Sequence, residues 1–299
     1  MTDPLYEQLT EEYPSHLRPF LDQDNIDESS LSEDQRLWRR DGVLIKERFL
    51  PEKVVDDYVA FRQEVKLEGG WKDPCPYMRH DELKDIALHG PLVDKMDELI
   101  GQPMALHLNL TGWVSTKRRF HSDDYLNPDF VRSHYIAVWI ALEDIHPDSG
   151  PYQFVRGSHR WPPLRRNKLF KMIPKEQARK GDWPSTTENI VAVACEQEIE
   201  RRAERVETFL GKKGDVLFWH GRLLHQGSMP AVPGTPRRAL IAHYSSMNHR
   251  PDMKVRRTYD KTGKPYFYFK QFLASKLEED TIETDKPSLL RRLVRGITG

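Results

Sequence analysis

The sequence predicts a mainly β protein with some helix (α+β), in which a jelly-roll or cupin-like core carries helices on its outside. Two observations support this prediction. Short apolar segments of strand length recur between Met104 and Tyr244, and turn-forming residues separate them. Two segments with helical periodicity precede the first of these strands. Short strands joined by long connections are typical of jelly rolls, so the helices are expected to pack against the core from outside.

The N-terminal third is expected to supply an arm and the two helices. Residues 1–36 are rich in Asp, Glu, Ser and Pro with little apolar periodicity, and they predict a loosely held arm. Asp41–Leu50 predicts a short strand that leads into Pro51, a residue suited to the first turn of a helix. Apolar residues at helical spacing then predict helices over 51–67 and over Pro91–Ile100.

Four core strands are expected after these helices: Met104–Leu110, Tyr135–Leu142, Val216–Trp219 and Ala239–Tyr244. The turns between them contain three glycines that predict positive φ: Gly150, Gly157 and Gly214. The charged, partly helical stretch 160–211 interrupts the strands, and we expect an insertion near the barrel mouth that acts as a lid. The charged tail 275–299 favours a terminal helix docked on its own domain, although a basic amphipathic helix also suits lipid or a partner. The expectation is one domain, 1–299.

The composition excludes several classes of protein. The 299 residues contain 46 basic and 46 acidic side chains, so no net charge points to nucleic acid or an anionic membrane. The two cysteines are far apart and outside any Cys-x-x-Cys pattern, which favours a reducing, cytoplasmic location. No apolar stretch has the length of a transmembrane helix, and residues 1–12 contain no signal-peptide core.

Three residues have the chemistry of a metal site. His121 and Asp123 are two positions apart, so on an extended backbone both side chains point the same way. His225 would arrive from a distant strand (225 − 121 = 104 positions later). Two imidazoles and one carboxylate on one face of a metal leave the other face open, as in non-haem Fe(II) oxygenases. Asp124 competes for the carboxylate role only in a helical segment, and His220 competes with His225.

Longer blocks around these residues resemble the phytanoyl-CoA dioxygenase family. They are Val138–Pro151, Val155–His159, Lys213–His225 and Arg237–Leu240, and the resemblance extends over residues 40–246. It implies a double-stranded β-helix enzyme that uses Fe(II), O2 and 2-oxoglutarate. It does not imply phytanoyl-CoA as the substrate, because members of the family act on many small molecules.

The resemblance also implies roles for individual residues. His121, Asp123 and His225 match the family's metal ligands. Arg237 matches the arginine that pairs with the distal carboxylate of 2-oxoglutarate, a task suited to a planar, permanently charged guanidinium. Three further residues are expected at the cosubstrate pocket: Ser228, one position later than the usual hydroxyl; Trp139, which matches a pocket tryptophan; and Asn109, near the place of a lysine that this chain lacks.

The expected reaction is hydroxylation of an unactivated C–H bond in a small-molecule substrate, with release of succinate and CO2. Asp123 supports this expectation, since related halogenases have a small residue at that position. The alternative is a non-catalytic or differently metallated cupin-like protein that binds small molecules. Arg118 and Arg119 either attract an anionic substrate or are ordinary surface charges. The motifs specify neither the substrate nor the oligomeric state.

Overall fold

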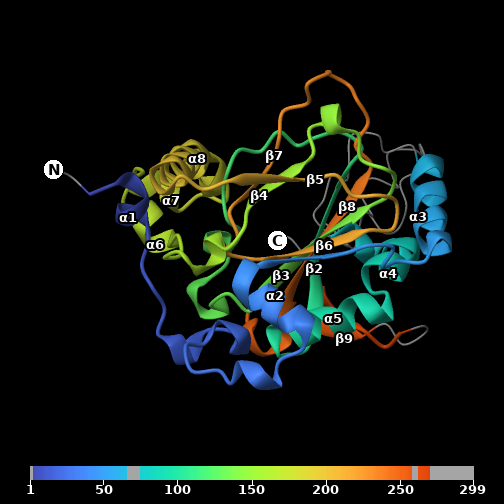
Figure 1. Cartoon of the computed structure of the whole chain (residues 1–299), viewed down its shortest axis with the longest axis horizontal. Helices are drawn as coiled ribbons and strands as arrows, with labels where there is room; N and C mark the ends of the chain where they lie inside the picture. Colours follow the sequence, from blue (N-terminus) through green and yellow to red (C-terminus); the bar gives the residue numbers. More distant parts are fainter. Residues whose placement is uncertain (1–2, 66–74, 258–261, 270–299) are drawn as a thin grey trace, which may run out of the picture.

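The computed structural model describes residues 3–65, 75–257 and 262–269. Two β-sheets form the centre of the molecule (Figure 1). The larger sheet has the strand order β1-β6-β3-β8-β2-β10-β9, and the smaller has the order β5-β4-β7. In chain order the strands are β1 (Val43–Lys46), β2 (Met104–Gly112), β3 (Tyr135–Ala141), β4 (Tyr152–Val155), β5 (Val206–Phe209), β6 (Val216–His220), β7 (His225–Gly227), β8 (Ala239–Ser246), β9 (Lys254–Arg257) and β10 (Pro265–Tyr268). This is the expected jelly-roll, or double-stranded β-helix, core.

The central strand β3 shows how the two faces of the larger sheet differ. Every residue of β3 is buried, and it pairs antiparallel with both β6 and β8. Ala137 lies opposite Trp219 and His243, and these side chains face the smaller sheet in the barrel interior. Val138 lies opposite Ala242, and both belong to the apolar cluster under the helices. Because both faces are covered, the strand is a continuous apolar run.

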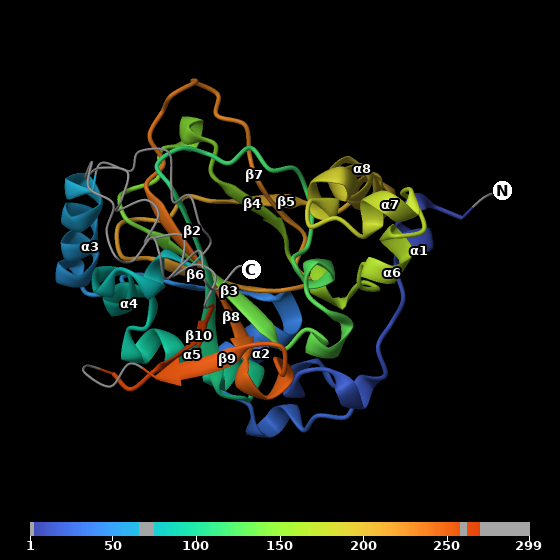
Figure 2. The same cartoon turned by 180° about the vertical axis from the view of Figure 1, so that it is seen from behind.

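Helices cover the outer face of the larger sheet and one end of the barrel (Figures 1 and 2). The longer ones are α2 (Glu33–Asp41), α3 (Glu52–Glu64), α4 (Asp81–Ala87), α5 (Gly90–Ile100) and α8 (Trp183–Arg202). The short helices are α1 (Leu5–Leu9), α6 (Arg166–Leu169), α7 (Lys175–Ala178), η1 (Ser15–Leu17), η2 (Phe20–Asp22), η3 (Glu28–Ser30), η4 (Pro76–Met78), η5 (Asp124–Leu126), η6 (Asp129–Val131), η7 (Pro147–Ser149), η8 (Ser158–Arg160) and η9 (Met247–His249). Among the described residues, no helix has the length and apolar character needed to cross a bilayer.

The structure confirms the four predicted core strands, as β2, β3, β6 and β8, and both predicted helices, as α3 and α5. Residues 66 and 67 of the first predicted helix lie outside the described residues, as does the predicted tail helix over 275–299. The three turn glycines have positive φ, as expected. At Gly150 (φ 75°) a Cβ atom would overlap the carbonyl oxygen of Ser228, so this turn tolerates glycine alone.

The prediction of a loosely held arm is wrong for the described part of residues 1–36. Leu9 and Leu21 are fully buried, and Tyr6 packs edge-to-face on Trp161 at a centroid distance of 6.1 Å. Single anchoring side chains separated by polar residues hold this segment. Such spacing produces no helical or strand periodicity, and the sequence pattern therefore did not reveal the packing.

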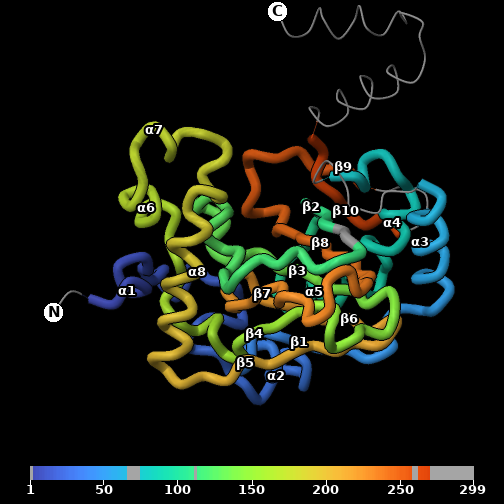
Figure 3. Tube along the Cα trace, turned by 90° about the horizontal axis from the view of Figure 1, so that it is seen from above, coloured from blue at the N-terminus to red at the C-terminus, as the bar shows by residue number. Residues whose placement is uncertain are grey.

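The stretch 160–211 is only partly an insertion. It contains α6, α7 and α8, as its helical character predicted, and α8 packs beside α1 at one end of the barrel (Figure 3). Its last residues form β5, which pairs with β4 as part of the smaller sheet. Only Phe209 of β5 is buried, because β5 is an edge strand, and its polar residues gave no strand signal.

Candidate active site

The smaller sheet and the loop before η5 bring the three predicted metal ligands together. His121 forms an isolated antiparallel bridge with His225 at the start of β7, with two backbone hydrogen bonds of 3.0 and 2.9 Å. One ligand atom from each of His121, Asp123 and His225 lies within 4.8 Å of the others. All three side chains are buried, and among the described residues no other group of His, Cys, Asp and Glu meets this criterion.

The predicted backbone geometry is correct at His121 and wrong at Asp123. Asp123 has φ −92° and ψ −21°, a helical conformation that opens the 3-10 turn η5. Its backbone N–H donates to the carbonyl of Gly221 at 2.8 Å. This bond anchors the turn just after β6 and keeps the carboxylate close to the imidazoles. Asp124 points elsewhere, to Tyr13 and Ser133, and so does not compete for the metal.

Hydrogen bonds orient both imidazoles. Nδ1 of His121 lies 2.7 Å from the carbonyl oxygen of Arg119, and Nδ1 of His225 lies 2.9 Å from that of Leu223. A carbonyl oxygen only accepts, so each Nδ1 carries the proton and each Nε2 presents a lone pair. This is the tautomer that binds a metal through Nε2.

The carboxylate of Asp123 is held by a residue that the sequence motif did not indicate. Trp219 donates from Nε1 to Asp123 Oδ2 at 2.9 Å, while Asp123 Oδ1 lies 3.6 Å from Nε2 of His121. His243 also faces this carboxylate, with Nδ1 4.0 Å from Oδ2. The sequence signal that could have revealed these two residues is a tryptophan and a histidine at inward-facing positions of predicted strands, on either side of β3.

The electrostatic environment favours the metal-binding protonation states. Burial lowers the pKa of His121 and of His225, so both rings are neutral near pH 7. Burial alone would raise the pKa of Asp123, but His225, His243 and His121 outweigh it and hold that pKa well below its usual range. Two neutral nitrogens and one carboxylate are the donor set that a ferrous ion takes in a facial triad, so the residues present fit this ion.

Arg237 lies on the same inward-facing row as His243. Its backbone N–H donates to Trp113 at 2.7 Å, which continues the pairing of β2 with β8, and alternate residues of β8 face the barrel interior. Arg237 is 3% exposed and donates from Nη1 to the Gly150 carbonyl at 2.7 Å. Nε has no hydrogen-bond partner in the described part of the chain, and burial lowers the pKa of Arg237 to about 10. A buried guanidinium that remains charged at pH 7 without a carboxylate needs an anionic ligand.

Arg237 and the metal ligand His225 both lie along β7. A Cβ atom at Gly227 would lie 3.6 Å from Nη1 of Arg237 and 2.8 Å from Oγ1 of Thr116. Gly227 follows His225 by two positions on β7, a distance of about 7 Å along an extended strand. A five-carbon dicarboxylate such as 2-oxoglutarate is of comparable length, so the residues present are compatible with this cosubstrate.

The other three predicted pocket residues have different positions. Ser228 Oγ donates to the carbonyl of Pro151 at 2.8 Å, so its proton is already engaged. The hydroxyls of Thr116 and Ser115 lie beside Gly227, as Nη1 of Arg237 does, and sequence reasoning missed them because they precede the metal motif instead of following it. Trp139 faces the barrel interior, with its Nε1 buried and without a partner among the described residues, and its role in the cosubstrate pocket stays a prediction.

The placement of Asn109 in the pocket is wrong. A register shift between Leu106 and Leu108 interrupts β2, and Asn109 then pairs with Ala242. Ala242 belongs to the cluster under the helices, and directly opposed residues share a face of the sheet. The side chain of Asn109 is therefore on the helix-covered face, whereas Leu108 and Leu110 face inward.

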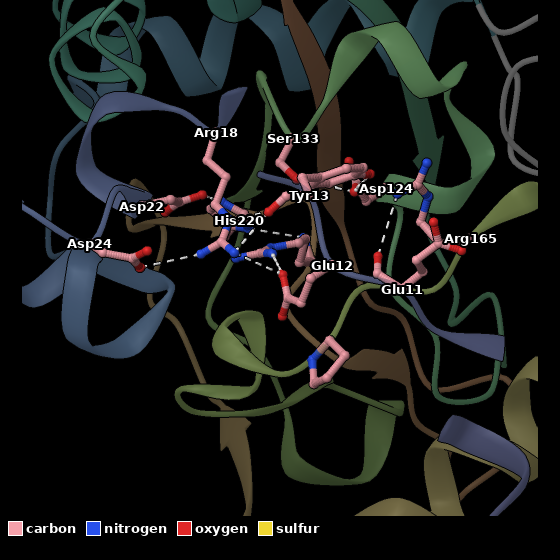
Figure 4. A network of polar contacts seen from close by, with 12 residues as sticks. Glu11, Glu12, Tyr13, Arg18, Asp22, Asp24, Asp124, Ser133, Arg165 and His220 are labelled. Carbon is pink, nitrogen blue, oxygen red and sulfur yellow. Dashed lines mark hydrogen bonds and ion pairs between the residues drawn. The ribbon is translucent and has the colours of Figure 1, made fainter. Parts of the chain in front are cut away.

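The competing histidine and arginine have structural roles. His220 is fully buried on the outer side of the site and contacts the carboxylate of Asp22 at 2.8 Å (Figure 4). Arg238 lies over the ring of Trp113 and approaches Glu143 at 3.6 Å. These contacts agree with the expectation that His225 and Arg237 are the inward-facing members of each pair.

The N-terminal segment also supports the metal loop. Tyr13 donates to Asp124 Oδ2 at 2.6 Å, and Ser133 donates to the same oxygen at 3.1 Å (Figure 4). Tyr13→Phe removes one of these donors from a buried carboxylate, and we expect a loss of unfolding free energy of about 1–3 kcal/mol in denaturant titrations. The metal affinity is expected to fall as well, because Asp124 adjoins Asp123. Tyr6→Phe is the matched control, since Tyr6 donates to the neutral carbonyl of Pro162; equal effects of both variants would contradict this role.

Comparisons with known proteins agree with this geometry. The family model described as phytanoyl-CoA dioxygenase (PhyH) matches residues 38–239. Among solved structures, the chain is similar to EctD from S. alaskensis with bound Fe (TM-score 0.54, 19% identity, covering 78% of this chain and 84% of that one). It is also similar to two non-heme alpha ketoglutarate dependent enzymes of nogalamycin biosynthesis. These are the carbocyclase SnoK (0.53, 22%, 73% and 85%) and the epimerase SnoN (0.52, 19%, 74% and 84%). No curated protein matches significantly.

Proposed function

This chain belongs to the phytanoyl-CoA dioxygenase family of Fe(II)- and 2-oxoglutarate-dependent oxygenases, and we propose that it hydroxylates an unactivated C–H bond of a small molecule. The observation that carries the proposal is the combination of the buried triad with the unpaired guanidinium of Arg237. A metalloenzyme that does not use 2-oxoglutarate would not need this buried cation, and a non-catalytic relative would usually have lost a ligand or the arginine.

The bound iron and 2-oxoglutarate supply the oxidising power: O2 provides one oxygen atom to the substrate and one to succinate, and CO2 is released. The protein contributes position and environment. Trp219 restrains one oxygen of Asp123, so the carboxylate keeps a fixed orientation at the metal. The ring of Tyr152 stacks on His225 at a centroid distance of 5.3 Å, and the apolar interior around it excludes water.

Hydroxylation is the specific reaction that we propose for this oxygenase. Asp123 would supply the third protein ligand of the metal, where related halogenases have a small residue, and this favours hydroxylation. The epimerase and carbocyclase of nogalamycin biosynthesis share the fold, so the identity of the product has to be measured and cannot be inferred from the fold.

The test is 2-oxoglutarate consumption in air by protein loaded with Fe(II), without added substrate and then with candidate small molecules. We expect slow, iron-dependent formation of succinate that accelerates with a substrate, and a product that is heavier by one oxygen atom. Equal turnover with Zn(II), or no succinate with Fe(II), would favour the alternative of a differently metallated or non-catalytic protein. A product without added oxygen would replace hydroxylation by another oxidation at the same site.

A further inference from the structure

One tyrosine of the smaller sheet projects into the barrel beside the metal ligands. Tyr152 of β4 lies directly opposite Gly227 of β7, so both residues are on the same face of the sheet. His225 precedes Gly227 by two positions and shares that face. Tyr152 is 3% exposed and belongs to the apolar cluster inside the barrel. It is therefore an inward-facing residue next to a metal ligand.

The aromatic ring of Tyr152 packs against two residues of the metal site. It stacks on the ring of His225 at a centroid distance of 5.3 Å and an interplanar angle of 20°. Its centroid also lies 5.3 Å from that of Trp219, which donates to the carboxylate of Asp123. These contacts place the ring at the metal end of the site.

The backbone of Tyr152 lies nearer the other end of the site. Gly227, its partner across the sheet, is the residue at which a Cβ atom would lie 3.6 Å from Nη1 of Arg237. The ring, in contrast, stacks on His225. Tyr152 therefore extends along the stretch between Arg237 and the metal ligands, which is the stretch that the cosubstrate would occupy.

The hydroxyl group of Tyr152 has no role in the packing. It is buried and has no hydrogen-bond partner among the described residues. An unsatisfied buried donor is unfavourable, and a phenylalanine would fill the same apolar space without that penalty. Because a tyrosine hydroxyl is protonated at pH 7, it can donate to a ligand oxygen. The hydroxyl is thus a donor that a bound ligand can satisfy.

The chelating end of a 2-oxo acid offers a suitable acceptor. Such an acid binds a metal through its 2-oxo oxygen and one oxygen of its C1 carboxylate, which leaves the second C1 oxygen free to accept. A competing donor is His243, whose Nε2 is also buried without a partner in the described part of the chain. Tyr152 is favoured, because His243 is six positions beyond Arg237 (243 − 237 = 6), about 20 Å of extended strand.

We propose that the hydroxyl of Tyr152 donates a hydrogen bond to the C1 carboxylate of 2-oxoglutarate, so that Tyr152 is a further cosubstrate-binding residue. Arg237 and Tyr152 then hold opposite ends of the same molecule. Tyr152 would fix the orientation of the chelating end, whereas Arg237 would supply the charge for the distal carboxylate. This inference rests on the proposed function, since it concerns the cosubstrate of the same site.

The experiment measures binding without turnover and compares two ligands. 2-Oxoglutarate and 2-oxopentanoate, which lacks the distal carboxylate, are titrated by calorimetry into full-length protein loaded with Zn(II). The variants are Tyr152→Phe, Arg237→Ala and His243→Phe. The matched control is Tyr244→Phe, because Tyr244 is a buried tyrosine of the helix-covered face whose hydroxyl donates to Ala87. The visible charge-transfer band of the anaerobic Fe(II) and 2-oxoglutarate complex is a second readout.

Tyr152→Phe is expected to weaken the binding of both ligands by the same factor, roughly tenfold or more, as for loss of a hydrogen bond to a charged group. Arg237→Ala is expected to weaken 2-oxoglutarate and to spare 2-oxopentanoate. The charge-transfer band is expected to move to shorter wavelength in Tyr152→Phe, because the C1 carboxylate loses a donor. Tyr244→Phe is expected to leave both affinities and the band unchanged.

Thermal unfolding of the cosubstrate-free protein separates binding from packing. Tyr152→Phe is expected to unfold at or above the wild-type temperature, since it removes an unsatisfied group. Tyr244→Phe is expected to unfold at a lower temperature, since it loses its hydrogen bond to Ala87. A Tyr152→Phe variant that unfolds more easily and binds both ligands like the wild type would show a purely structural hydroxyl and overturn the proposal.

Two other results would also overturn it. A loss confined to 2-oxoglutarate in Tyr152→Phe would assign the hydroxyl to the distal carboxylate. A loss of both ligands in His243→Phe, with Tyr152→Phe like the wild type, would transfer the role to His243. Failure of the proposed hydroxylation appears separately, as absent iron-dependent succinate or a product without added oxygen in the wild type.

Discussion

Asp123→Ala is expected to abolish Fe(II)-dependent turnover while the protein stays folded. The substitution removes the one anionic metal ligand and leaves Nε1 of Trp219 without its acceptor. Loss of a residue that only supports a metal ligand typically costs 10–100-fold in metal affinity, so loss of the ligand itself is expected to cost more than about 100-fold. The backbone bond from residue 123 to Gly221 is independent of the side chain, and it keeps the loop in place. Metal titration and succinate formation are the measurements.

The neighbouring carboxylate provides the control for this variant. Asp124→Asn keeps an oxygen that accepts from Tyr13 and Ser133, and it does not alter the triad. It is expected to retain metal binding. Turnover like that of the wild type in Asp123→Ala, or loss of metal in Asp124→Asn alone, would refute the assignment of Asp123 as the ligand.

Arg237→Ala is expected to weaken 2-oxoglutarate binding by about 2–5 kcal/mol, the range for removing one partner of a buried charge pair. This corresponds to a loss of roughly 30-fold to several thousand-fold in affinity. The reason is that the guanidinium is 3% exposed with an unsatisfied Nε, so the distal carboxylate would lose its main partner. Calorimetric titration of 2-oxoglutarate into Zn(II)-loaded protein measures the change.

Arg238→Ala is the matched control, because Arg238 contacts Trp113 and Glu143 on the other face of the strand. Its affinity for 2-oxoglutarate is expected to equal that of the wild type. The stability of the cosubstrate-free protein gives a second readout. If Arg237 served only to brace Gly150, its removal would lower the unfolding free energy and leave 2-oxoglutarate affinity intact, which would contradict the binding role.

The metal ligands and Arg237 were predictable because each lies in a short local pattern. His121 and Asp123 are two positions apart, and His225 and Arg237 belong to blocks that resemble one family. The strands of the larger sheet were predictable for a related reason: β3 is covered on both faces, and its sequence is a continuous apolar run. In these segments the local sequence was sufficient to predict the strand or the site residue.

Asn109 and β5 show where such reasoning fails. Asn109 was assigned to the pocket by its position in the sequence, but one irregularity at residues 106–108 transfers it to the opposite face of the sheet. β5 has one buried residue and no alternating pattern of apolar residues. It is a strand because its backbone pairs with one edge of β4. Neither outcome is encoded in a local period.

The sequence by itself predicted the fold class from hydrophobic periodicity, and the resemblance of its motifs to one family predicted the three metal ligands and the inward arginine. The tertiary structure alone decided which groups support this site: Trp219 holds Asp123, and Tyr13 holds the neighbouring Asp124. These contacts join residues from separate elements of the chain. Hydrogen bonding and charge neutralisation depend on distances of a few ångströms, which only the folded chain sets.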